Sequence, residues 1–164
     1  MAGMLLLSCT KQDRENTVID QEARIDSYIS QLPDLMRVVR REGANRIVTE
    51  EGPAGADTLA RGDSVLFHYA GYVFANGKGA LFATSREEVA ESYGFVTDGE
   101  PQKRKIDRDD LIPGLYNGLI GARKGEACQI VFSAKYGFGN TPVYKLPRLT
   151  PLLFEVWIED VIKN

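Results

Sequence analysis

The spacing of apolar residues changes near residue 45, where a helical period gives way to a period of two. Between residues 19 and 41, apolar side chains recur at helical intervals in two stripes, Ile25, Tyr28, Ile29 and Leu32 before Pro33, and Leu35, Met36 and Val39 after it. We therefore expect a helical segment over 19–45 that Pro33 kinks or divides, because proline lacks an amide hydrogen. Its apolar face could pack on the following domain or on a second copy of the chain, forming a homodimer.

From residue 46 to the C-terminus, apolar and polar residues alternate as they do in half-buried strands. We expect strands at 46–49, 65–69, 128–132 and 152–158, and another that begins at Leu81. Residues 86–108 are polar and weakly patterned, so we expect a long surface excursion there, with its basic run 103–105 in solvent. Many strands and one short internal helix predict an α+β domain over 46–164, with an antiparallel sheet wrapped around that helix.

The short helix is expected to start at Pro113, where the missing amide hydrogen costs nothing because first-turn amides have no partner inside a helix. The same proline favours an extended backbone at Ile112. The Ile112 N–H would then lie outside the helix at its positive end, beside apolar side chains. Such a free donor in an apolar hollow is suited to binding one carbonyl group.

Composition excludes several classes of function. The net charge of −3 argues against a nucleic-acid partner, which usually requires a basic excess. No apolar run approaches the length of a membrane-spanning helix. Cys128 falls in an apolar alternation and is expected to be a small buried core residue.

Cys9 has a different setting, because it ends the run Leu5-Leu6-Leu7-Ser8-Cys9 and polar sequence follows at once. The run resembles the lipobox of bacterial lipoproteins, in which the cysteine is acylated after the signal peptide is removed. The alternative is a disordered N-terminus. We interpret residues 1–18 as a signal remnant with lipidation at Cys9, followed by a flexible polar tether over 10–18.

Several motifs resemble, in order and nearly in spacing, those of the FKBP-type peptidyl-prolyl cis-trans isomerases. They are His68-Tyr69-Ala70-Gly71-Tyr72, Leu81-Phe82 with Thr84-Ser85-Arg86, Leu111-Ile112-Pro113-Gly114, Lys124-Gly125-Glu126, the run from Ser133 to Gly139, and Leu152-Leu153-Phe154-Glu155-Val156. With the lipobox, the chain resembles bacterial envelope lipoproteins of this type, including those associated with gliding motility. That resemblance implies a lipid anchor in the periplasm or at the outer membrane.

The family resemblance implies a strongly twisted antiparallel sheet around one short helix, with an aromatic hollow between them. The residues expected to act directly on the prolyl bond are Tyr69, Phe82, Ile112, Leu115 and Phe154, and those expected to line the rest of the substrate site are Leu111, Tyr136, Phe138 and Leu146. The partners implied are proline-containing polypeptides and macrolide inhibitors. Isomerisation by transfer of the bond into an apolar site requires no metal, cofactor or nucleophile.

Three positions depart from the family pattern. Ala83 replaces an acidic residue, Leu115 replaces a tryptophan at the floor, and Phe138 replaces a tyrosine whose hydroxyl donates to a bound carbonyl. The usual aromatic at the pocket mouth has no clear counterpart, although Tyr93 or Phe95 could substitute. Two functions therefore remain open: an isomerase with weakened activity on envelope proteins, or a non-catalytic chaperone or interaction module in a cell-envelope or gliding-type machinery.

Overall fold

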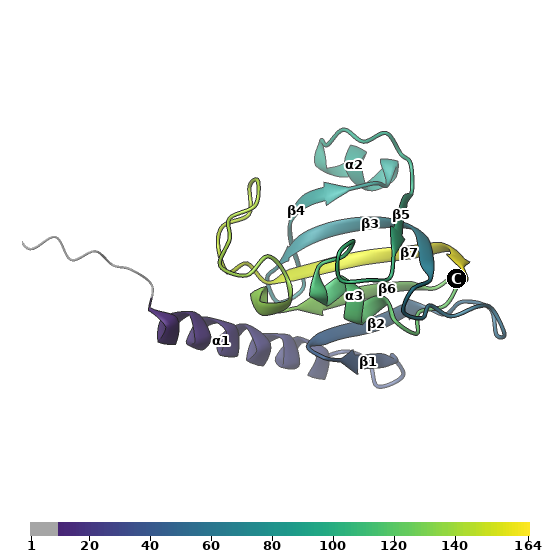
Figure 1. Cartoon of the computed structure of the whole chain (residues 1–164). Coiled ribbons are helices and arrows are strands. Elements are labelled where there is room, and N and C mark those ends of the chain that lie inside the picture. Colours follow the sequence, from purple (N-terminus) through teal and green to yellow (C-terminus); the bar gives the residue numbers. More distant parts are fainter. Residues whose placement is uncertain (1–9) are drawn as a thin grey trace, which may run out of the picture.

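The computed structural model describes residues 10–164, and in it a twisted antiparallel sheet curls around a short helix (Figure 1). Its seven strands are β1 (Val38–Arg41), β2 (Ala44–Glu50), β3 (Ser64–Phe74), β4 (Lys78–Thr84), β5 (Gln102–Lys105), β6 (Ala127–Phe132) and β7 (Leu152–Ile162). The strand order is β1-β2-β6-β7-β3-β4, and β5 pairs with β3 beside that path. The α+β fold predicted from the alternation of residues is confirmed.

The two longest strands, β3 and β7, send alternate side chains to two apolar clusters on opposite faces of the sheet. The inner cluster faces helix α3 (Pro113–Leu119) and contains Val65, Phe67, Leu115, Leu119, Cys128, Ile130, Phe132, Phe154, Val156 and their neighbours. The outer cluster contains Ile25, Ile47, Ala70, Tyr72, Phe74, Leu81, Val131 and Leu153. Cys128 is 2% exposed, and burial raises the pKa of its thiol, so it is an unreactive core residue as expected.

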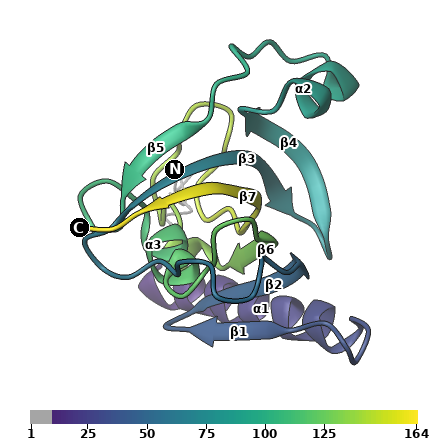
Figure 2. The same ribbon diagram turned by 90° about the vertical axis from the view of Figure 1, so that its right-hand side faces the viewer.

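Helix α1 (Lys11–Ser30) packs on the outer cluster, as its position beneath the sheet in Figure 2 shows. Ile25 is 2% exposed, and the Tyr28 ring meets the Phe74 ring edge-on with centroids 5.6 Å apart. The Tyr28 hydroxyl donates to Gln129 Oε1 at 2.8 Å. The apolar stripe at Ile25, Tyr28, Ile29 and Leu32 therefore lies on the sheet of its own chain.

The expected tether at residues 10–18 is wrong, because α1 already begins at Lys11. Thr10 and Asp13 form a capping box, in which the Asp13 amide donates to Thr10 Oγ1 at 3.1 Å and the Thr10 amide donates to the Asp13 carboxylate at 3.2 Å. These two bonds satisfy amides that the first turn leaves free and stabilise a polar helix start. Cys9, with its predicted lipidation, lies outside the described residues.

The second helical stripe, predicted after Pro33, is also wrong. The helix ends at Ser30, and a turn follows in which the Met36 amide donates to the Pro33 carbonyl at 2.9 Å. Residues 38–41 form β1, where Val38 pairs with Ile47 of β2. Hydrogen bonding to β2 therefore decides the conformation of this segment, and Leu35 is left fully exposed.

The surface excursion expected at 86–108 contains two regular elements. Helix α2 (Glu87–Tyr93) ends at Gly94, whose φ of 70° suits a glycine cap. Gln102–Lys105 form β5, which pairs with Ser64–Phe67 of β3, so the basic run 103–105 belongs to a strand and not to a solvated loop. In Figures 1 and 2, α2 lies at the end of the molecule remote from α1.

No helix within residues 10–164 combines the length and the apolar character needed to cross a bilayer.

Candidate functional site

A cavity of about 250 Å³ opens between the inner face of the sheet and α3. Its walls come from β3, β4, β5, β7, the start of α3 and the loop after β6, and the residues that line it are Phe67, Tyr69, Phe82, Ala83, Gln102, Arg104, Asp110, Leu111, Ile112, Leu115, Phe138 and Phe154. Most of these side chains are apolar or aromatic, with a few polar groups on one side. This composition is typical of small-molecule and peptide sites.

Three aromatic rings form the wall of the cavity. The Phe154 ring lies 5.7 Å from the Phe82 ring in an edge-on arrangement and 6.3 Å from the Tyr69 ring. On its other side Phe154 stacks on the buried ring of Phe132, with centroids 6.0 Å apart. The strands β3, β4 and β7 bring these rings together, and the contact with Phe132 holds the wall against the inner cluster.

Gly71 makes room for the Phe82 ring. A β-carbon at Gly71 would lie 2.5 Å from Phe82 Cζ, closer than side chains approach one another. A glycine at this position of β3 therefore leaves room for the tip of the Phe82 ring, which lines the cavity.

Ile112 presents the backbone donor that the Pro113 motif predicts. It is the N-cap of α3, with φ −62° and ψ 151°, and Pro113 occupies the first helical position. The Ile112 carbonyl accepts from the Tyr116 amide at 2.9 Å, whereas the Ile112 N–H donates to no group within residues 10–164. One unpaired amide hydrogen therefore lies at the wall of an apolar cavity.

The backbone of Tyr69 is fixed by the end of β4. The Tyr69 amide donates to Ser85 Oγ at 3.0 Å, and the Tyr69 carbonyl accepts from Thr84 Oγ1 at 2.8 Å. His68 Nδ1 lies 3.1 Å from the same Ser85 oxygen, which agrees with a structural role for His68. Burial raises the pKa of the Tyr69 hydroxyl, so it keeps its proton, and it donates to no group in the part of the chain that is described.

Seven of the nine residues predicted for the hollow line the cavity: Tyr69, Phe82, Leu111, Ile112, Leu115, Phe138 and Phe154. Tyr136 and Leu146 do not line it. The Tyr136 ring lies against Gly43, on the side of α3 that faces the β1–β2 hairpin, and Leu146 is a core residue that is 6% exposed. Leu146 belongs to the inner cluster that supports the cavity, and Tyr136 packs against that cluster.

The sequence reasoning missed the polar side of the cavity, which Gln102, Arg104 and Asp110 supply. Gln102 and Arg104 belong to β5, whose residues show no alternation and gave no strand signal. Tyr93 and Phe95, considered for the mouth, do not line the cavity. They lie on the outer side of the sheet, where the Tyr93 and Tyr72 rings are 6.1 Å apart and Phe95 packs on the outer cluster.

The described residues contain no side-chain group suited to binding a metal ion. Within residues 10–164 no three His, Cys, Asp or Glu side chains are grouped so that they could hold a metal ion. The cavity itself offers aromatic walls, one backbone N–H, one tyrosine hydroxyl and a charged rim. These groups can desolvate and orient a ligand and can donate hydrogen bonds to it.

Comparisons with known proteins agree with this geometry. The chain is 30% identical over 121 residues to FK506-binding protein 1A of Neurospora crassa, an alignment that covers 73% of this chain and 89% of that protein. It is 28% identical over 101 residues to FK506-binding protein 2 of Aspergillus fumigatus, covering 62% of this chain and 66% of that protein.

Two bacterial crystal structures share the fold. A peptidyl-prolyl cis-trans isomerase from Pseudomonas syringae pv. tomato superposes with a TM-score of 0.68 at 18% identity, covering 94% of this chain and 99% of that one. FkpA from Escherichia coli superposes with a TM-score of 0.63 at 23% identity, covering 93% of this chain and 64% of that one.

The family profile described as FKBP-type peptidyl-prolyl cis-trans isomerase matches residues 55–159, which include every residue that lines the cavity. The chain therefore belongs to the FKBP-type peptidyl-prolyl cis-trans isomerase family.

Proposed function

We propose that this protein catalyses the cis–trans isomerisation of X–Pro peptide bonds in the cavity beside α3. The observation that carries the proposal is the unpaired Ile112 N–H at the edge of an aromatic cavity of about 250 Å³. A carbonyl of the substrate would accept this hydrogen bond. The prolyl ring would then occupy the space between Tyr69, Phe82 and Phe154.

The chemistry needs no reactive side chain. Resonance gives the peptide bond partial double-bond character and a rotational barrier of about 18–20 kcal/mol. Water that hydrogen-bonds to the amide oxygen stabilises the charge-separated planar form. An apolar cavity withdraws this stabilisation, and the less polar twisted state loses less by the transfer, so the barrier falls.

Each lining residue then has a distinct role. Phe82, Tyr69 and Phe154 hold the prolyl ring, and Leu115, on α3, is the floor. Leu111 and Phe138 complete the apolar rim. Tyr136 and Leu146 support the cavity from the core and are not proposed to touch the substrate.

A protease-coupled isomerisation assay on a short Leu-Pro peptide tests the proposal. We expect the full chain at micromolar concentration to raise the isomerisation rate above the uncatalysed rate. A rate equal to the background, from a sample shown to be folded by circular dichroism, would eliminate the enzymatic function.

A second function is favoured by the three departures from the family pattern. With Ala83, Leu115 and Phe138, the cavity lacks a carboxylate, the area of an indole ring and a phenolic hydroxyl that the family pattern has. The loss of the hydroxyl donor alone weakens binding of a carbonyl group by about 0.5–1.5 kcal/mol. The cavity would then bind prolyl segments without useful turnover, as in a chaperone or interaction module. Binding of the same peptide with no gain in isomerisation rate would support this alternative.

The names of both fungal relatives describe binding of FK506. We extend this to a macrolide ligand for the present cavity, where a ligand carbonyl would accept from the Ile112 N–H. A macrolide that competes with the Leu-Pro peptide would support a shared site.

We further propose that the protein acts at the bacterial cell envelope, anchored by lipid on Cys9. The support is the lipobox-like run Leu5-Leu6-Leu7-Ser8-Cys9, after which polar sequence begins directly. Mass spectrometry of the protein from its native membrane tests this, because a diacylated or triacylated Cys9 adds a defined mass. An unmodified Cys9 would contradict the anchor and leave the activity of the cavity unaffected.

A further inference from the structure

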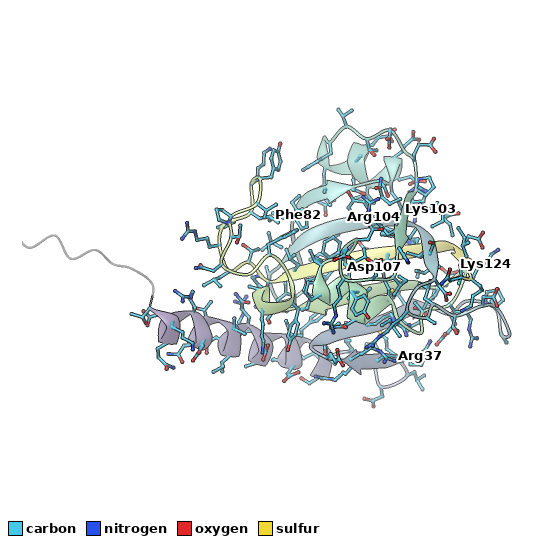
Figure 3. The ribbon with its side chains drawn as sticks, in the orientation of Figure 1. Arg37, Phe82, Lys103, Arg104, Asp107 and Lys124 are labelled. Atoms are coloured by element: carbon cyan, nitrogen blue, oxygen red, sulfur yellow. The ribbon has the colours of Figure 1, made fainter. Side chains whose placement is uncertain are left out.

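The mouth of the cavity carries one basic side chain, Arg104, and one acidic side chain, Asp110, as its charged lining groups within the described residues. Arg104 comes from β5, where Figure 3 labels it beside Lys103. Successive residues of a strand point to opposite faces, and Arg104 lines the cavity whereas Lys103 does not. The Arg104 side chain is 41% exposed. The positive charge of Arg104 lowers the pKa of the Tyr69 hydroxyl, and the negative charge of Asp98 raises it, against the larger rise that burial causes. A guanidinium group therefore faces the place proposed for the prolyl ring.

Most of the hydrogen-bonding capacity of Arg104 is available to a ligand. Of its five N–H donors, one on Nη1 is used, by the Lys103 carbonyl at 3.0 Å. Its Nε forms an ion pair with Asp110 Oδ1 at 4.0 Å, which is partly exposed and beyond hydrogen-bond distance, so these N–H groups remain open to a ligand. The other oxygen of Asp110 accepts from the Lys105 amide at 2.7 Å, so the carboxylate is held by the backbone.

The same contacts prevent a peptide ligand from pairing with β5 as an additional strand. Asp110 occupies the Lys105 amide, and the Lys105 carbonyl accepts from the Asp107 amide at 2.9 Å. Both outward backbone groups of this residue are therefore occupied, which blocks a growing ladder. Recognition at this edge would come from side chains.

The lining of the cavity limits which ligand group Arg104 can meet. The cavity of about 250 Å³ has aromatic and apolar walls that suit a prolyl ring, with Arg104 and Asp110 on its polar side. Because consecutive Cα atoms are about 3.8 Å apart, a residue that directly precedes the proline would lie close to this polar side.

We propose that Arg104 is a specificity-determining residue that favours X–Pro segments in which X is Asp or Glu. This inference rests on the proposed function of the cavity and names the class of its substrates. A carboxylate at X would accept charge-assisted hydrogen bonds from the free N–H groups of Arg104.

The experiment compares kcat/KM for two peptides that differ only in Glu-Pro against Gln-Pro, which removes the charge and keeps the shape. For the unaltered chain we expect the Glu-Pro peptide to be favoured about 2- to 5-fold at low salt, the range for a partly exposed ion pair. The ratio should fall to about one in Arg104→Gln. In Arg104→Glu the Glu-Pro peptide should become a poorer substrate than the Gln-Pro peptide, and a Lys-Pro peptide should be a better one.

Lys103→Gln is the matched control, because it removes the same charge from the same strand on the face away from the cavity. We expect its Glu-to-Gln ratio to equal that of the unaltered chain. A ratio of one in the unaltered chain, or a ratio lost equally in Arg104→Gln and Lys103→Gln, would overturn the role of Arg104.

The two proposals fail in different ways. If no peptide is isomerised, the proposed catalysis fails, and the shift of the Ile112 amide resonance on titration with each peptide still measures specificity. Tighter binding of the Glu-Pro peptide that is lost in Arg104→Gln would support the inference, and equal or absent binding of both peptides would contradict it.

Discussion

The two faces of the sheet carry similar aromatic residues and differ in what covers them. On the outer face, Phe74 is 2% exposed and meets the Tyr28 ring of α1. On the inner face, α3 spans only Pro113–Leu119 and leaves the rings of Phe82 and Tyr69 partly exposed at a cavity. The same strand, β3, supplies rings to both faces, so residue type alone does not distinguish a binding site from a core.

The difference lies in the length and fit of the covering helix. Helix α1 packs on the outer cluster through Ile25, Tyr28 and Ile29. It is also tied by Gln21, whose Oε1 accepts from the Ala134 amide at 2.9 Å and whose Nε2 donates to the Leu149 carbonyl at 2.7 Å. Helix α3 is seven residues long and begins at a proline. Because α3 is short, it covers only part of the inner face of the sheet, and the candidate site lies in the part that it leaves uncovered, beside its free N-terminal donor.

The largest expected effect is on stability, at the outer face. Phe74→Ala should lower the free energy of unfolding by about 3–5 kcal/mol, because it removes a fully buried ring and leaves a cavity. Urea denaturation measures this loss. Isomerase activity per folded molecule should stay unchanged, and a parallel loss of activity would show that the two faces do not act separately.

At the inner face we expect the opposite result, a large loss of activity with a small loss of stability. Phe82→Ala should reduce kcat/KM for a Leu-Pro peptide at least tenfold, which corresponds to about 1.4 kcal/mol in the barrier. Its unfolding free energy should fall by only about 1 kcal/mol, because the ring is already partly exposed. Unchanged turnover in this variant would refute the assignment of the cavity.

A smaller effect is expected from a single hydroxyl group. Tyr69→Phe keeps the ring and removes the one side-chain hydroxyl that lines the cavity. Because burial raises the pKa of this group, it is a protonated donor at neutral pH. We expect a loss of about 0.5–1.5 kcal/mol in transition-state stabilisation, measured as kcat/KM, with no change in folding. An equal activity in Tyr69→Phe would mean that the Tyr69 hydroxyl makes no hydrogen bond that stabilises the transition state.

The smallest expected effect is a pH dependence that belongs to neither face. The Lys163 ammonium group and the amides of Ala60 and Asn164 hold the pKa of Asp63 below its ordinary value. The unfolded chain has the ordinary value of about 3.9. The stabilisation is therefore complete above about pH 4 and is lost as the pH falls through the lower, folded-state pKa.

Asp63→Asn tests this pH dependence. It should lower stability at pH 7 by less than about 1 kcal/mol, because Lys163 is partly exposed, and should flatten the acid limb of the stability curve. Activity at pH 7 should not change. An unaltered acid limb would exclude Asp63 as the titrating group.

The inner face was largely predictable from the sequence. Pro113 determines where α3 begins, and it leaves Ile112 extended with a free N–H, since both effects are local. The alternation in β3 and β7 gave the rings on each face. The family resemblance also assigned Tyr136 and Leu146 to the hollow, and neither lines the cavity, because a family motif does not determine which side of α3 each apolar residue meets.

The rim and the N-terminal helix were not predictable in the same way. The run Gln102–Lys105 has no apolar alternation and becomes a strand only through its pairing with β3, so Arg104 gave no sign of facing a cavity. At the N-terminus the capping signal of Thr10 and Asp13 was present in the sequence. Residues 10–18 are polar and lack an apolar stripe, so the pattern of apolar residues predicted no helix there. The capping box stabilises the start of α1 without such a stripe.

The most direct test of the central claim is exchange NMR of a Leu-Pro peptide with the folded protein at micromolar concentration. The open inner face predicts faster cis–trans exchange together with a shift of the Ile112 amide resonance, and Phe82→Ala should diminish both while Phe74→Ala preserves them. Exchange at the uncatalysed rate, with the Ile112 amide unmoved at saturating peptide, would contradict the account.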